Sequence, residues 1–144
     1  MIRKLGFFFA IGLPIFAFAL MPTAAKAQSF SGNWPLKVSK AKYSNGTYCM
    51  TLTDNGSLGF PHRGQASLTS PNFDGNTLDG SFQLINGLLT ATFETQGDSG
   101  QNAGLVFILR AADGTMSNGV YDDVYDGEEL DSGAAVAGAK GGCS

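Results

Sequence analysis

Glycine preceded by asparagine or aspartate recurs along this chain at intervals of roughly ten residues, and this spacing is the strongest constraint on its fold. Such dipeptides adopt the positive φ angles that tight hairpin turns need. Short runs rich in Thr, Val, Phe, Tyr and Leu lie between them, without sustained helical periodicity. The pattern predicts many short antiparallel strands, as in a sandwich or barrel. The pairs are Asn45-Gly46, Asn55-Gly56, Asp74-Gly75, Asp79-Gly80, Asn86-Gly87, Asp113-Gly114, Asn118-Gly119 and Asp126-Gly127.

Within these runs apolar and polar residues alternate, as they do in strands that are buried on one face. Tyr48, Met50 and Leu52, for example, share a face that Cys49 does not. We expect strands at 33–38, 47–53, 65–69, 77–85, 89–95 and 105–109, and two more around 115–125 and 129–136. The predicted fold class is all-β, an antiparallel up-and-down barrel of about eight strands, because closure removes the sheet edges. Bulky inward side chains should occupy most of the lumen.

The segment Leu105–Leu109 departs from the alternation, because it is apolar on both faces. Either another part of the chain covers its outer face, or that face is a contact surface. The candidate contact patch consists of Val106 and Ile108 together with Tyr121 and Tyr125, since aromatic and aliphatic side chains dominate the centres of protein interfaces.

The first 27 residues have the pattern of a secretory signal peptide. Arg3 and Lys4 are followed by the apolar run Phe7–Leu20 and by the small-residue site Ala25-Lys26-Ala27. The run has 14 residues, fewer than the about 20 that a membrane span needs. Cleavage is expected after Ala27, which leaves residues 28–144 as a single secreted or periplasmic domain without a membrane span.

The remaining chain has six basic and twelve acidic residues, a net charge of −6. A surface of this sign repels phosphate groups, so the charge argues against nucleic acid and anionic membrane surfaces as partners.

Two cysteines remain after the leader, Cys49 and Cys143, and the expected compartment is oxidising. We predict a disulfide between them, with a free or intermolecular thiol at a mobile end as the alternative. Cys49 has outward parity on its strand. The glycine-rich tail Gly138–Ser144 is therefore predicted to wrap over the outside of the barrel.

The only histidine, His62, lies in the polar segment Gly59–Gly64. A solvated loop histidine is one interpretation. The other is a recognition loop formed by Phe60, His62 and Arg63, because loops on a rigid scaffold often carry binding residues. One histidine and two paired cysteines give too few ligands for a zinc site, so neither a metal nor another cofactor is expected.

Two further motifs suggest chemistry but have simpler interpretations. Gly97-Asp-Ser-Gly100 looks like the nucleophile motif of chymotrypsin-like proteases, and His62 and Asp79 precede it in the matching order. That catalytic triad needs a two-barrel scaffold of roughly twice this length, so we interpret the motif as a turn. Six carboxylates lie within Asp122–Asp131, which indicates a solvated face, with a weak Ca²⁺ site or a patch for a basic partner as alternatives. No enzymatic activity is expected.

The start of the mature chain resembles the calycin group of barrels, which includes lipocalins, avidins and small secreted bacterial inhibitors of metalloproteases. Phe30-Ser-Gly-Asn-Trp34 places a Gly-x-Trp on the first expected strand, and Gly46-Thr-Tyr-Cys-Met-Thr-Leu52 places an outward Cys on the next. The resemblance covers about the first 30 mature residues and the rhythm of the strands. It departs from the lipocalins in lacking a late Thr-Asp-Tyr-type motif, from the avidins in having Trp34 alone, and from the inhibitors in the position of the second cysteine.

We therefore expect an exported, non-enzymatic barrel. The first hypothesis is a protein-interaction module, either inhibitor-like or associated with the cell envelope. The alternative is a calycin-type binding protein for a small apolar ligand. A cavity above about 300 Å³ would favour ligand binding, whereas a packed lumen with an exposed apolar patch would favour the interaction module.

Overall fold

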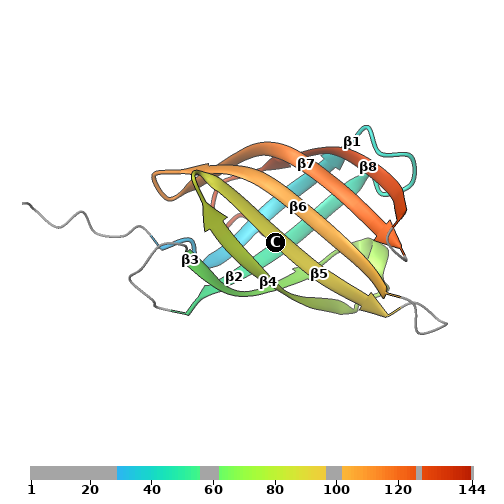
Figure 1. The fold of residues 1–144 in the computed structure, drawn as a ribbon, viewed down its shortest axis with the longest axis horizontal. Coiled ribbons are helices and arrows are strands. Elements are labelled where there is room, and N and C mark those ends of the chain that lie inside the picture. The colour runs from blue at the N-terminus through green and yellow to red at the C-terminus, as the bar shows by residue number, and fades with distance from the viewer. Residues whose placement is uncertain (1–28, 56–61, 97–101, 126–127, 144) are drawn as a thin grey trace, which may run out of the picture.

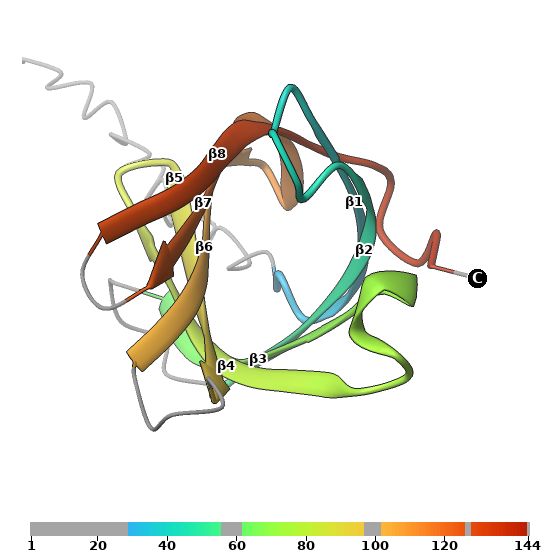
Figure 2. The same cartoon turned by 90° about the vertical axis from the view of Figure 1, so that its right-hand side faces the viewer.

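The computed structural model describes residues 29–55, 62–96, 102–125 and 128–143, and they form a closed antiparallel barrel (Figures 1 and 2). Each strand pairs with the next in sequence, and the last pairs with the first, so the meander leaves no open edge. The strands are β1 (Gly32–Ser39), β2 (Gly46–Asp54), β3 (His62–Thr69), β4 (Thr77–Ile85), β5 (Leu88–Gln96), β6 (Asn102–Ala112), β7 (Thr115–Tyr125) and β8 (Glu128–Ala137). A single 3₁₀ turn, η1 (Pro71–Phe73), lies between β3 and β4.

The predicted fold class is confirmed, because the eight strands lie where the alternation of side chains placed them. The largest difference in length is at β6, which extends to Asn102–Ala112 and pairs along its length with β5. β6 also carries a register shift against β7 between Leu109 and Ala111.

Most of the lumen is filled by the predicted inward side chains. Met50, Leu68, Phe107 and Leu109 have no exposed surface at all. Such packing is close to that of a crystal and leaves little free volume in the middle of the barrel. Among the largest side chains in this core are Trp34, Leu36, Leu52, Leu89, Phe93 and Tyr121.

Gly75, Gly87 and Gly114 each form a turn together with the Asp or Asn before it, since both residues of each pair have positive φ. For two other pairs, Asp79-Gly80 and Asn118-Gly119, the prediction of a turn is wrong. Gly80 lies inside β4 and Gly119 inside β7. Their hydrogens allow a neighbouring strand to approach, because a Cβ at Gly80 would meet the Thr92 carbonyl and one at Gly119 the Ile108 carbonyl.

The predicted disulfide joins Cys49 on β2 to Cys143, with the two Cα atoms 5.8 Å apart. The tail that leads to it runs along β1 and outside the barrel, as Figure 2 shows. The Gly138 amide donates to the Pro35 carbonyl at 2.8 Å, and the Gly141 amide donates to the Asn33 carbonyl at 2.7 Å. A disulfide of this kind is typical of chains that fold in an oxidising extracellular or periplasmic environment.

Candidate functional site

The two ends of the barrel differ. At the end where β1 begins, Trp34 closes the lumen: its indole Nε1 donates to the Phe30 carbonyl at 2.9 Å, and its ring stacks on that of Phe30. At the other end, where the β1–β2 connection and η1 lie, the structure has a cup of about 370 Å³. The residues lining it come from that connection, from η1 and from β2, β5, β6 and β7: Tyr43, Ser44, Asn45, Tyr48, Asn72, Phe73, Thr95, Leu105, Tyr121 and Asp123.

Aromatic rings form the floor of this cup. Tyr48 and Tyr121 lie with their ring centroids 6.1 Å apart, and beneath them Phe107 lies 5.8 Å from Tyr48 and 5.1 Å from Tyr121. Phe73 of η1 packs on Tyr48 from the side, at 5.8 Å. The floor is therefore continuous with the core, which makes it rigid.

The two phenol groups lie within a network of hydrogen bonds. The Tyr48 hydroxyl donates to the Ser44 carbonyl at 2.8 Å. Burial raises the pKa of Tyr48, and hydrogen bonds with Asn72 and Tyr121 offset only part of this effect. Burial likewise raises the pKa of Tyr121, against a smaller effect from the Ser44 side chain. Both phenols are thus neutral at physiological pH and keep their protons for hydrogen bonding.

Asp131 of β8 holds the connection that forms one wall of the cup. Its carboxylate accepts hydrogen bonds from three successive backbone amides, those of Lys42 at 2.7 Å, Tyr43 at 2.8 Å and Ser44 at 2.9 Å. Burial by itself would raise the pKa of Asp131, but these hydrogen bonds outweigh it and lower the pKa to about 2. Asn45 closes the same turn by exchanging two hydrogen bonds with the backbone of Ala41.

The hydrogen bonds of Asp131 predict that the β1–β2 connection, which forms the rim of the cup, loses stability in acid. The pKa of Asp131 is lower in the folded chain than in the unfolded one, so its stabilisation is complete above the unfolded value of about 3.9 and is lost as the pH falls towards 2. Asp131→Asn should lower the stability at pH 7 and reduce the loss between pH 4 and pH 2, as measured by urea unfolding. Asp79→Asn, at an exposed position of β4, is the control and should leave the acid-induced loss unchanged.

Asp123 of β7 faces the cup from the other side. It lies opposite Leu105 of β6 and Asp131 of β8 in the strand registers. Burial raises the pKa of its carboxyl group, and the nearby charge of Asp131 adds to the effect. Among the described residues, no basic side chain or hydrogen-bond donor offsets this shift. Asp123 is therefore a half-buried carboxyl group, and in the described part of the chain no basic side chain lines the cup beside it.

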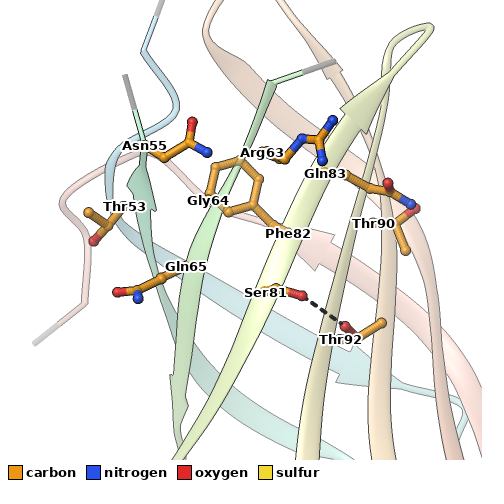
Figure 3. A pocket seen from close by; sticks show the side chains of 10 residues that line it. All are labelled: Thr53, Asn55, Arg63, Gly64, Gln65, Ser81, Phe82, Gln83, Thr90 and Thr92. Carbon is orange, nitrogen blue, oxygen red and sulfur yellow. Dashed lines mark hydrogen bonds between the residues drawn. The ribbon is translucent and has the colours of Figure 1, made fainter. Parts of the chain in front are cut away.

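A second, larger depression of about 720 Å³ lies on the outer surface of β2–β5 (Figure 3). Polar side chains line it in two cross-strand rows, which are Thr53, Gln65, Ser81 and Thr92, and Arg63, Gln83 and Thr90. The hydroxyl groups of Ser81 and Thr92 are 3.5 Å apart. Nearly all these side chains are exposed to water, so this groove has the properties of an ordinary solvated sheet surface.

The outer surface of β6–β8 carries an apolar strip. In the strand registers Ile108 lies opposite Val120, which lies opposite Ala134. Val120 and Val136 are 47% and 49% exposed. Val106 and Ile108, two residues of the predicted contact patch, belong to this strip and are half-buried.

The two tyrosines of the predicted patch lie elsewhere. Tyr121 is 1% exposed and forms part of the cup floor, so it lies on the opposite face of β7 from Val120. Tyr125 has the same parity as Tyr121 and ends β7 at the cup end of the barrel. The prediction that Tyr121 belongs to an exterior contact surface is therefore wrong, because the pairing of β7 directs it into the lumen.

The prediction that Phe60, His62 and Arg63 form one recognition loop is also altered by the structure. His62 and Arg63 are the first residues of β3, not loop residues, and Arg63 lines the exterior polar groove. Phe60 lies outside the described residues, as does the Gly97–Gly100 motif. The acidic run divides between the two faces of the β7–β8 pair, with Asp122 outside and both Asp123 and Asp131 towards the lumen.

Within the described ranges, no group of three or more histidine, cysteine or carboxylate side chains is placed to share a metal ion. The same ranges contain no helix that could cross a membrane. Comparisons with protein families, with curated proteins and with solved structures give no match.

Proposed function

We propose that this protein is an exported, non-enzymatic binding protein of calycin type that takes a small ligand into the cup at the mouth of its barrel. The observation that carries the proposal is the contrast between the two ends of the lumen. Trp34 closes one end, whereas at the other the described residues line a cup with inward-facing polar side chains. Inward polar groups at an open barrel end are costly to fold unless water or a ligand satisfies them.

The dimensions of the cup fit a small molecule. Its volume of about 370 Å³ lies in the lower part of the range of ligand sites. The fully buried Phe107 beneath the floor stops a ligand from going deeper. A few polar groups above a rigid aromatic base are the usual composition of such sites. The disulfide and the signal-peptide pattern of the first 27 residues support a secreted or periplasmic location.

A pair of threonine variants on β5 tests this assignment. Thr95 lines the cup, whereas Thr92 faces outwards into the exterior groove. The probe is 2-phenylethanol, followed through the NMR chemical shifts of backbone amides. We expect shifts at Ser44 and Asp123, and Thr95→Trp should weaken binding at least about tenfold, equivalent to about 1.4 kcal/mol, by filling the cup.

Thr92→Trp is the matched control and should leave binding of the probe unchanged. Loss of binding in Thr92→Trp but not in Thr95→Trp would move the site to the exterior groove. Shifts scattered over the surface without saturation would overturn the proposal.

Contact with another protein is the second candidate function, and the apolar strip on β6–β8 supports it. The exposed Val120 lies opposite the predicted contact residue Ile108, and the exposed Val136 of β8 lies on the same outer surface. Sedimentation of the wild-type protein and of Val120→Lys would test this surface in self-association. The two functions are compatible, because the strip and the cup lie on different faces of β7.

A further inference from the structure

Given that the cup binds a small ligand, we propose that this ligand is a protonated amine carried on a small apolar or aromatic body. The geometry that points to this class is the position of the Asp123 carboxylate in the cup wall, with aromatic and aliphatic side chains around the remaining space.

The charges at this end of the barrel are the first argument. Asp123 and Asp131 are cross-strand neighbours, and both lie on the lumen side of the sheet. Asp131 is fully engaged by the three backbone amides of the rim, whereas no amide or basic side chain among the described residues compensates Asp123. Two like charges in a half-buried place repel an anionic ligand and attract a cation.

The hydrogen-bonding groups of the cup are the second argument. Besides the carboxylate of Asp123, the walls present side-chain oxygens of Ser44, Asn72 and Thr95. An ammonium group has donors only, so it can use several such acceptors at once. A carboxylate or phosphate would find no positive charge within the lining.

The apolar part of the lining is the third argument. Phe73 and Leu105 lie in the cup walls, and Tyr43 stands at the rim with 71% of its surface exposed. The Tyr43 ring carries the chain's own cation, since the Lys42 ammonium lies 4.6 Å from its centroid, and Lys42 is not among the residues that line the cup. A ligand with its amine at Asp123 can place its apolar body against Phe73 and Leu105.

Three probes with the same phenyl ring and a two-carbon arm test the charge preference: phenethylamine, 2-phenylethanol and 3-phenylpropionate. Dissociation constants are measured by NMR titration at pH 7 and low salt. We expect phenethylamine to bind at least about tenfold more tightly than the neutral alcohol, and the anion to bind most weakly. Asp123→Asn should remove this preference while keeping the affinity for 2-phenylethanol.

Asp122→Asn is the matched control. It makes the same change in net charge on the adjacent residue, but Asp122 faces outwards opposite Val106 and should leave the preference unchanged. Equal binding of the amine and the alcohol to the wild-type cup would overturn the amine proposal and leave ligand binding intact. Failure of all three probes to shift the cup residues would overturn both. If circular dichroism shows that Asp123→Asn does not fold, the relative affinities of the three probes for the wild-type protein decide the test.

Discussion

Replacing Phe107 with alanine is expected to lower the free energy of unfolding by about 3–5 kcal/mol, as measured by urea denaturation. Phe107 has no exposed surface and lies between the rings of Phe93, Tyr48 and Tyr121, with centroid distances from 5.1 to 6.2 Å. Its removal forfeits the burial of a whole ring and leaves a cavity in the middle of the barrel. Strands on all sides pin the neighbouring rings, so the cavity has little freedom to collapse.

Phe73→Ala is the control for this prediction. Phe73 is only partly buried and lies at the mouth, where water can replace its ring. We expect a loss of about 1 kcal/mol there. A loss at Phe107 no larger than that at Phe73 would mean that the lumen is loosely filled. Binding of the proposed amine ligand should also weaken in Phe107→Ala, because the rings of Tyr48 and Tyr121 lose the ring that packs beneath them.

The fold was predictable from the sequence because its two main determinants are local. Alternation along the segment Thr47–Thr53 sets which side chains of β2 face the core, and Asn or Asp before glycine fixes the tight hairpins. The same dipeptide gave a wrong prediction of a turn at two positions where glycine is present for another reason. At Gly80 and Gly119 the absent Cβ makes room for a neighbouring strand, and only the assembled sheet reveals this contact.

The cup was less predictable, because it depends on which residues the closed barrel brings to one end. In β7 apolar residues occupy both parities, with Val120 and Val124 on one and Tyr121 and Tyr125 on the other, so alternation leaves its orientation open. Acidic residues usually indicate a solvated face, which hid the inward positions of Asp123 and Asp131. For Asp123 the available signal was its spacing from Tyr121 on the same strand, since residues two apart in a strand share a face.

The tail disulfide should provide the other large contribution to stability. Replacing both Cys49 and Cys143 with serine is expected to lower the free energy of unfolding by about 2–4 kcal/mol. The bridge spans 94 residues, and the entropy of a chain cross-linked over such a loop allows up to about 4.7 kcal/mol. We expect less, because the barrel closes through β1 and β8 without help from the tail.

Hydrogen exchange can show whether the disulfide stabilises the protein by constraining the unfolded chain or by holding the folded barrel closed. If the bridge acts mainly on the unfolded chain, all amides that exchange through global unfolding should accelerate by one common factor in the double variant. Beyond that factor, only the amides of Gly138 and Gly141, which hold the tail on β1, should exchange faster. Amides of the β1–β2 ladder should accelerate no more than those of the other strands. Dithiothreitol should destabilise the wild type to the level of the double variant and leave the variant itself unchanged. A loss below about 1 kcal/mol would contradict this assignment, because the unfolded chain would then already be compact. Acceleration in β1 and β2 beyond that of the other strands would also contradict it, because the tail would then be part of the closure of the barrel.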